Sequence, residues 1–311
     1  MNTIDHAPAY RERSRAELHA RADALWARYQ ACDCCPHACG VDRTAGETGQ
    51  CGIADTALVA SYGPHYGEEP PIVGAGGSGT IFLAGCPLSC VFCQNHRSSQ
   101  GRAGAPATPS AIADMAIELQ ERGCANVNFV TPTHVPGHIV RAIELAVDRG
   151  LSIPIVWNCG GYASVSVLKS LDGIVDIYMP DVKFANDELA TRYAGAPAYW
   201  ERATAALREM HRQVGDLQVD DGIATSGVLV RHLVLPGHVE NSTAVLEFVA
   251  EALSRDTYLN LMGQYRPSYR ANGSDEFGTL DRRPTQAEYD AVVARGRDLG
   301  LTRMQVDNRP L

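Results

Sequence analysis

The sequence predicts an α/β fold: a partial (β/α)6, TIM-like barrel that follows an N-terminal cysteine-rich extension. First, apolar strand-like segments alternate with helical segments from residue 78 onward, which predicts a parallel sheet. Second, eight of the ten cysteines lie within the first 93 positions, five of them in a Gly-rich segment before the first strand. We therefore expect residues 1–75 to form a helix and a metal-binding extension, and residues 76–311 to form the barrel with a C-terminal helix.

The elements follow one another in a regular order. A helix is expected over residues 16–29, before the cysteine-rich segment that ends near residue 73. A Gly, Pro and Ser-rich connector over residues 98–109 follows the first strand. The six expected strands cover residues 78–85, 125–132, 153–159, 175–183, 227–237 and 257–265. The remaining expected helices cover residues 110–123 (capped by Ser110), 138–150, 164–173, 187–214, 241–255 (capped by Asn241) and 285–299.

Polar residues gather where these strands end. Right-handed crossovers place the carboxyl ends of parallel strands at one edge of the sheet. One barrel mouth is therefore expected to be ringed by Cys86, Thr131, Asn158, Asp181, Arg231 and Gln264. Neighbouring positions of a strand face opposite ways, and we expect Arg231 rather than His232 to point inward. A buried ion pair at the barrel floor is the alternative role for Arg231.

Charge and hydropathy exclude two classes of partner. The 311 residues include 36 acidic and 27 basic ones, a formal charge of -9, and no basic run that would grip nucleic acid. No segment approaches the roughly 18 apolar residues that a membrane-spanning helix needs, and the start of the chain lacks the apolar core of a signal peptide. We expect a cytoplasmic protein that has no nucleic-acid or membrane partner.

The first cysteine group is the set Cys86, Cys90 and Cys93 in GCPLSCVFC, directly after the first expected strand. A cubane iron-sulfur cluster usually takes four thiolates, so three from one tight loop would leave one iron open to another ligand. A structural zinc loop with a fourth ligand from elsewhere is the alternative.

The second cysteine group precedes the barrel in CDCCPHACGVDRTAGETGQCG. A four-thiolate set from this segment closes a tetrahedral zinc site as readily as it holds a second iron-sulfur cluster. Free thiols are a third possibility, although five cysteines in such a segment would be prone to oxidation. The expected ligands are Cys32, Cys35, Cys39 and Cys51, with Cys34 as the spare.

The CxxxCxxC loop, with Phe92 before its last cysteine, resembles the signature of the radical S-adenosylmethionine superfamily. The stretches EEPPIVGAGGSGTIFLAGCPLSCVFCQN, NVNFVTPTH, VDIYMPDVKF, VRHLVLPG and LNLMGQYRP are similar to its pyruvate formate-lyase activating enzyme-like group. The resemblance implies a 4Fe-4S cluster whose open iron binds S-adenosylmethionine. It also implies that S-adenosylmethionine is cleaved reductively to a 5'-deoxyadenosyl radical, which abstracts hydrogen from a substrate. An electron donor such as flavodoxin or ferredoxin is implied as well.

The resemblance also assigns residues to the cofactor site. Lys183, in a DxK stretch of the fourth strand, matches a position that contributes to this site in related activating enzymes, whereas a surface pair with Asp181 is the alternative. The LPG turn around Pro236 resembles a turn against the adenosine. Where the class has a GGE-like element, this chain has Thr131, Thr133 and His134. The remaining candidates for cofactor binding are Phe92, Asn95, Asn158, Asp181, Arg231 and Gln264.

Two residues are candidates for catalytic roles. His134 is a candidate proton donor or substrate contact, with an ordinary loop histidine as the alternative. Tyr265 is a candidate acid/base or radical-quenching group, together with Tyr178, His232 and Glu69.

Three functional hypotheses follow from these residues. The first is a radical enzyme that acts on a small molecule, because no cysteine follows Cys159 and the N-terminal extension is placed to cover the barrel mouth. The second is an activating enzyme that installs a glycyl radical on a partner protein. The third is a non-catalytic iron-sulfur redox or sensor protein, which has no use for an open iron that faces a barrel mouth.

Overall fold

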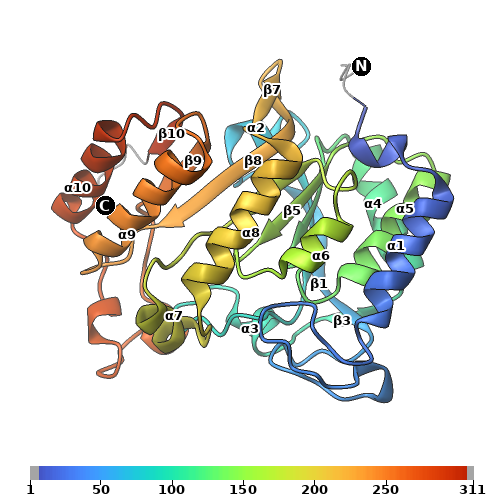
Figure 1. The fold of residues 1–311 in the computed structure, drawn as a ribbon, viewed down its shortest axis with the longest axis horizontal. Coiled ribbons are helices and arrows are strands. Elements are labelled where there is room, and N and C mark those ends of the chain that lie inside the picture. Colours follow the sequence, from blue (N-terminus) through green and yellow to red (C-terminus); the bar gives the residue numbers. More distant parts are fainter. Residues whose placement is uncertain (1–6, 307–311) are drawn as a thin grey trace.

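The computed structural model describes residues 7–306, which form one mixed β-sheet with helices packed along its outer face (Figure 1). The strands are β1 (Ala57–His65), β2 (Ser78–Leu83), β3 (Ala105–Ala107), β4 (Val127–Val130), β5 (Ile155–Cys159), β6 (Ile177–Pro180), β7 (Gln218–Asp220), β8 (Ile223–Leu233), β9 (Tyr258–Met262) and β10 (Met304–Val306). Their order along the sheet is β10-β9-β8-β6-β5-β4-β2-β1-β3, and β7 pairs with β8.

The six expected strands are confirmed as a parallel array. β2, β4, β5, β6, β8 and β9 are neighbours in chain order, and every pair among them is parallel. Among residues 7–306, no pairing joins the β9–β10 edge back to the β1–β3 edge, so the barrel is partial and open. All six carboxyl ends therefore meet at one side of the sheet.

Four strands were not predicted. β1 pairs antiparallel with β2 and with β3, and β3 lies within the expected connector. β7 forms a hairpin with β8, and β10 adds a parallel strand beside β9. The pairing of β1 with β2 means that the N-terminal extension contributes directly to the barrel sheet.

The expected helices are present, but the one expected over residues 187–214 is divided in two at Gly195 and Ala198, which have left-handed backbones. The helices are α1 (Arg15–Ala27), α2 (Pro70–Val73), α3 (His96–Ser99), α4 (Pro109–Glu121), α5 (Pro136–Asp148), α6 (Val165–Ser170), α7 (Asp187–Ala194), α8 (Tyr199–Val214), α9 (Val239–Phe248) and α10 (Gln286–Asp298). Of these, α2 and α3 were not predicted. The cap of α4 is Thr108, not Ser110, because the Thr108 hydroxyl accepts the Ala111 N–H. Asn241 lies inside α9, where its side chain binds the Ala185 N–H and the Lys183 carbonyl instead of capping the helix.

The extension is anchored to the barrel at several points. α1 begins with a Ser14–Glu17 capping box and packs on α5. Arg43 is fully buried; it donates from Nη1 to the His134 carbonyl at 2.6 Å and lies 4.2 Å from the ring centroid of Tyr29. The cysteine-rich segment is therefore fixed against the barrel through a buried guanidinium.

Successive side chains along each strand point to opposite faces of the sheet, so the buried residues form an outer core and an inner one. Trp157 and Val228 belong to the outer core beneath the helices, whereas Val156 and Leu229 belong to an inner cluster that also contains Ile72. Ile72 lies in α2, which packs beside β8 although the preceding β1 lies at the far side of the sheet (Figure 1). Residues 66–73, which we call the strap, therefore cross the concave face of the open barrel.

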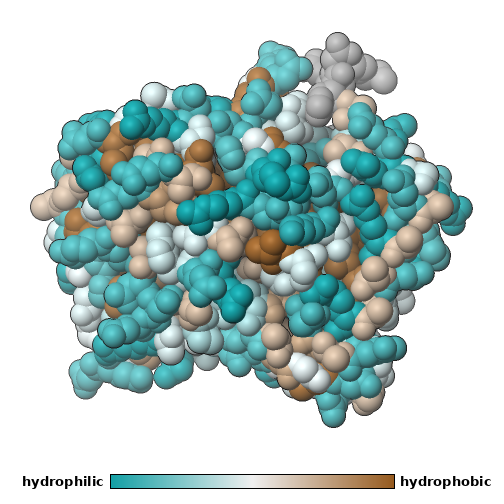
Figure 2. Space-filling view, in the orientation of Figure 1, coloured by the Kyte–Doolittle hydropathy of each residue, from teal (hydrophilic) through white to brown (hydrophobic). Residues whose placement is uncertain are grey.

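The apolar side chains of this chain are mostly buried. Figure 2 shows mainly hydrophilic residues on the face that carries α6 and α8, with apolar residues in small separate patches. No helix within residues 7–306 combines the length and the apolar character needed to cross a bilayer.

Candidate functional site

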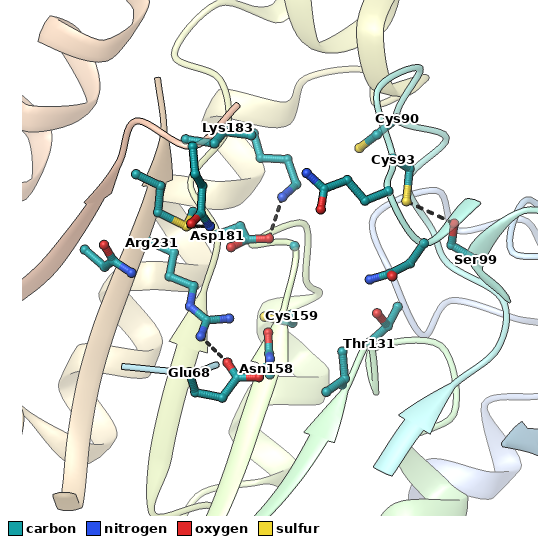
Figure 3. A pocket seen from close by; sticks show the side chains of 18 of the residues that line it. Glu68, Cys90, Cys93, Ser99, Thr131, Asn158, Cys159, Asp181, Lys183 and Arg231 are labelled. Atoms are coloured by element: carbon teal, nitrogen blue, oxygen red, sulfur yellow. Dashed lines mark hydrogen bonds and ion pairs between the residues drawn. The ribbon is translucent and has the colours of Figure 1, made fainter. Parts of the chain in front are cut away.

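A cavity of about 870 Å³ lies between the ends of the parallel strands and the strap (Figure 3). It gathers most of the residues that the sequence singled out from distant parts of the chain. Those that line it are Cys86, Cys90, Phe92, Cys93, Asn95, Thr131, Asn158, Asp181, Lys183, Arg231, Gln264 and Tyr265. The strand ends thus form one mouth, as expected from the parallel topology.

The loop of Cys86, Cys90 and Cys93 forms one wall of the cavity and is held by backbone bonds. Ser89 and Val91 donate their N–H groups to carbonyls at the end of α7, at 2.7 and 2.8 Å. The Leu88 N–H points at the Cys86 sulfur at 3.4 Å, and the Cys93 sulfur lies 3.3 Å from the Ser99 hydroxyl. Such donors stabilise a thiolate, so the loop is already arranged around its sulfur atoms.

The three thiols fit the expected cluster. All three line the same cavity and lie within one eight-residue loop, which keeps the three sulfur atoms near one another. Burial raises the pKa of Cys90 to about 12, so a bound metal must displace its proton. Within residues 7–306 no three His, Cys, Asp or Glu side chains converge as ligands of a single ion. Thiolates on different irons of a cubane stand farther apart than ligands of one ion.

Asp181 and Lys183 form an ion pair inside the cavity, at the end of β6 (Figure 3). Burial lowers the pKa of Lys183, but the Asp181 carboxylate and the Cys90 thiolate outweigh burial and raise it above its ordinary value. Only 17% of the Lys183 side chain is exposed, so the alternative of an ordinary surface pair does not describe it. The ammonium is thus charged and is directed into the same space as the cysteine loop.

Arg231 points into the cavity, as expected, but its guanidinium is bound to the strap. Its Nε donates to Glu69 at 2.7 Å, and its Nη2 donates to both Glu69 and Glu68. Asn260 on β9 also donates to Glu69, at 2.5 Å. Burial raises the pKa of Glu69, but the bonds from Arg231 lower it below its usual range overall. The ion pair expected as the alternative role of Arg231 is therefore present.

Thr131 and Tyr265 both line the cavity. Thr131, after β4, has a left-handed backbone with φ 62, which a β-branched residue rarely adopts. Its N–H donates to the Asn158 carbonyl at 2.8 Å. Tyr265 packs edge-on against Phe92 at 5.8 Å and donates its hydroxyl to the Leu280 carbonyl at 2.6 Å. The Tyr265 hydroxyl is therefore engaged with the backbone.

Five of the predicted cofactor-binding and catalytic residues do not line the cavity: Thr133, His134, Tyr178, His232 and Pro236. His134 is 1% exposed, and its Nε2 lies 2.9 Å from the Ala84 carbonyl. Burial lowers the pKa of His134 to about 4, so the ring is neutral and ties the loop after β4 to the end of β2. Because it does not reach the cavity, the proton-donor role expected for His134 has no geometric support.

The N-terminal cysteines lie on the opposite side of the Cys86–Cys93 loop. Turns fold this segment back on itself: the Gly40 N–H donates to the Cys32 carbonyl at 3.0 Å, and the Gln50 N–H, next to Cys51, points at the Cys39 sulfur at 3.4 Å. His37 Nε2 lies 2.8 Å from the Pro87 carbonyl, and Gln50 donates to Ser89 at 3.1 Å. The segment therefore packs against the back of the cluster loop.

Some residues of the cavity were not singled out as site residues in the sequence. Glu68 and Asn260 complete the Arg231 cluster, and Ser99 contacts the Cys93 sulfur. The strap could have been found from the acidic pair Glu68–Glu69, which lies amid apolar residues and prolines. The sequence around Asn260 and Ser99 does not indicate a site residue, because their partners are set by the tertiary structure.

Comparisons with known proteins agree with this geometry. The family model of the radical SAM superfamily matches residues 80–249, more than half of the chain. The protein named "Uncharacterized protein MJ0674" of Methanocaldococcus jannaschii is 31% identical over 273 residues, which cover 85% of this chain and 74% of that protein.

Two solved structures are also similar. The structure described as "Native anSMEcpe with bound AdoMet" has a TM-score of 0.45 and 11% identity, and the match covers 74% of this chain and 59% of that chain. The cobalamin-dependent S-adenosylmethionine radical enzyme OxsB has a TM-score of 0.41 and 16% identity, over 72% of this chain and 31% of its own length. This chain thus spans less than two thirds of either structure. By the family match, the chain belongs to the radical SAM superfamily.

Proposed function

We propose that this protein uses S-adenosylmethionine and a 4Fe-4S cluster to abstract hydrogen from a small-molecule substrate. One observation supports it above all: Cys86, Cys90, Cys93 and the Asp181–Lys183 pair face the same cavity of about 870 Å³. When bound, the cluster and S-adenosylmethionine supply a 5'-deoxyadenosyl radical. The residues of this chain hold, orient and enclose the reactants.

Each group has a proposed role. Cys86, Cys90 and Cys93 hold the cluster through three of its irons. The Lys183 ammonium binds the carboxylate of S-adenosylmethionine, because it is the buried cation that faces the cysteine wall. Thr131 and Asn158 supply hydrogen bonds from the neighbouring strand ends. An external reductant such as flavodoxin or ferredoxin delivers the electron.

The size of the cavity favours a small substrate. Pockets that enclose one drug-sized ligand measure about 300–1,000 Å³. A cavity of about 870 Å³ therefore has room for the cofactor and one further small molecule. The strap crosses the floor of this cavity and is held to β8 by the Glu69–Arg231 pair.

We further propose that residues 1–75 form a metal-binding extension whose ligands are Cys32, Cys35, Cys39 and Cys51. Its support is the folding of this segment, in which Gly40 donates to the Cys32 carbonyl at 3.0 Å and the Gln50 N–H points at the Cys39 sulfur at 3.4 Å. Cys34, the expected spare, lies beside Cys32 and lowers its pKa by a hydrogen bond. A second cluster and a zinc ion are the two candidates for this site. The cluster is favoured, because no three His, Cys, Asp or Glu side chains within residues 7–306 converge on a single ion.

The direct test follows cofactor cleavage. Protein that has been reconstituted anaerobically and reduced with dithionite should form 5'-deoxyadenosine and methionine from S-adenosylmethionine. The Cys90→Ala variant should form neither, whereas Cys159→Ala, which removes a lone thiol from the same cavity, should retain cleavage. Cleavage by Cys90→Ala at the wild-type rate would refute the assignment of the loop.

The substrate class is tested with cell extract divided at a low molecular-mass cut-off. Stimulation of cleavage by the small-molecule fraction supports the proposal. Stimulation by the protein fraction alone, with a glycyl radical signal in electron paramagnetic resonance, would instead identify an activating enzyme. A fully loaded cluster that never cleaves S-adenosylmethionine would favour a redox or sensor protein.

A further inference from the structure

The hydroxyl of Tyr199 lies where two strands of the candidate site separate. Tyr199 is the first residue of α8 and is fully buried. Its ring stacks on Tyr162 at 5.9 Å and meets Phe184 edge-on at 5.5 Å. Phe184 in turn contacts Phe92 of the cysteine loop, at 6.4 Å between ring centroids. Aromatic packing on several sides therefore fixes the direction of the phenol.

The phenol oxygen makes three contacts, all with backbone groups that follow β5 and β6. It accepts the Lys183 N–H at 3.0 Å. It lies 3.0 Å from the Gly160 carbonyl and 3.1 Å from the Asp181 carbonyl, and its single proton serves these two acceptors. Burial raises the pKa of Tyr199, so the phenol keeps this proton at any physiological pH.

These contacts continue the pairing of the strands beyond the end of their ladder. The last pair of the β5–β6 ladder is Cys159 with Pro180, and one more backbone bond joins Asp181 to Cys159 at 2.8 Å. Beyond that point the segments that follow β5 and β6 would be free to separate. The Tyr199 hydroxyl spans them from outside the sheet, directly behind the residues that carry the cavity ion pair.

We propose that Tyr199 is a positioning residue that sets the direction of Lys183 toward the cofactor. This inference rests on the proposed function, in which Lys183 binds the carboxylate of S-adenosylmethionine. Tyr199 does not line the cavity, so it acts through the backbone of Lys183 and Asp181. Without the hydroxyl, the Lys183 N–H loses its partner. The segment beyond Asp181 is then held from the side of β8 and α9, through Arg231 and Asn241, but no longer from the side of β5.

The test is the Tyr199→Phe variant, which removes one oxygen and keeps the ring. The matched control is Tyr162→Phe, because Tyr162 stacks on Tyr199 and donates its hydroxyl to Pro197 at 2.9 Å, away from the strand ends. Binding of S-adenosylmethionine is measured by calorimetry on reconstituted protein with an oxidised cluster, so that no cleavage occurs. Tyr199→Phe should raise the Kd about tenfold, and Tyr162→Phe should change it by less than about twofold.

A double-mutant cycle with Lys183→Met separates positioning from general damage. If Tyr199 acts through Lys183, Tyr199→Phe should change the Kd by less than about twofold in the Lys183→Met background. In cleavage assays, Tyr199→Phe should raise KM for S-adenosylmethionine more than it lowers kcat. An equal effect of Tyr199→Phe in both backgrounds, or a wild-type Kd, would overturn the inference.

The outcomes distinguish the inference from the proposed function. If Lys183→Met raises the Kd and Tyr199→Phe does not, only the role of Tyr199 fails. If Lys183→Met binds normally, the assignment of Lys183 fails and the role of Tyr199 fails with it. Should Tyr199→Phe not fold, Gly161→Ala perturbs the same contacts, because its Cβ would stand 2.5 Å from the Asp181 carbonyl oxygen and 3.2 Å from the Tyr199 hydroxyl. Because its φ of 75 adds strain, urea unfolding first establishes that this variant is folded. It should raise the Kd only while Lys183 is present.

Discussion

At the residue scale, Thr131 combines backbone strain with a place in the cavity. A left-handed β-branched residue costs about 1–3 kcal/mol and persists only where the surrounding structure enforces it. The strain and the position after β4 are both consistent with a hydroxyl held in place for a ligand.

We therefore expect Thr131→Gly to raise or preserve the free energy of unfolding, by up to about 1 kcal/mol, because glycine tolerates φ 62. The same substitution should weaken binding of S-adenosylmethionine on the order of tenfold, through the lost hydroxyl. Urea unfolding and calorimetry measure the two effects. Asp221→Gly is the control: it relieves a left-handed residue in the β7–β8 turn and should leave binding unchanged. Wild-type binding by Thr131→Gly would exclude the hydroxyl from the cofactor site.

The sequence predicted those residues whose role follows from their spacing along the chain. The CxxxCxxC loop and the polar residues after each strand were located in this way, and the cavity brings them together. Tyr199 and Asn260 were missed, because their partners lie far along the chain or belong to the backbone. His134 was placed in the site by its loop position, but its ring turns to the Ala84 carbonyl instead.

At the element scale, the strap depends on Glu69. Its carboxylate is 1% exposed and binds Arg231 from β8 and Asn260 from β9, so it joins the N-terminal extension to the far strands of the open barrel. Removal of one partner from a buried ion pair leaves the other charge uncompensated.

Glu69→Gln should accordingly lower the free energy of unfolding by about 3 kcal/mol at neutral pH. The lowered pKa of Glu69 means that this contribution is present above the ordinary carboxyl pKa and is lost as the pH falls through the lowered one. Urea unfolding at several pH values should show the variant and the wild type converging in acid. Glu276→Gln, which breaks an exposed pair with Arg270, should change stability by less than about 0.5 kcal/mol. Equal effects of the two substitutions would contradict the role of the strap.

The stability that Asp176 contributes should depend on pH in the opposite way to the contribution of Glu69. This buried carboxyl accepts the Ile155 N–H at 2.8 Å and the Ala9 N–H at 2.6 Å, and so ties the start of the chain to β5. Burial raises its pKa to about 7, so the folded state keeps a proton that the unfolded state loses near pH 4. Relative to Asp176→Asn, the wild type should lose about 3 kcal/mol of stability between pH 5 and pH 8, most of it below pH 7. Parallel stability curves for the two proteins would contradict the raised pKa.

The parallel strands were predictable because each is an apolar run followed by a crossover helix. β1, β3, β7 and β10 were missed for physical reasons. β3, β7 and β10 are three residues long each, too short to show a period, and β1 contains Gly63 and Pro64. Their pairing is set by neighbouring strands rather than by their own residues.

At the scale of the whole molecule, the cysteine loop separates two regions. One side of it faces the cavity with the Asp181–Lys183 pair, and the other is packed against the N-terminal cysteine segment through His37 and Gln50. The two sets of thiols are thus neighbours in space but have separate surroundings.

We expect the two proposed metal centres to load independently. Cys90→Ala should lose the iron of the barrel cluster and all cleavage of S-adenosylmethionine, while the N-terminal metal remains. Cys35→Ala should lose the N-terminal metal and keep the barrel cluster with part of its cleavage activity, because Cys35 lies outside the cavity. Iron, sulfide and zinc counts per chain, taken with the yield of 5'-deoxyadenosine, measure both losses. Loss of both metals from either variant would mean that the thiols form one shared site. An intact barrel cluster without any cleavage in Cys35→Ala would instead place the N-terminal metal within the path of the electron.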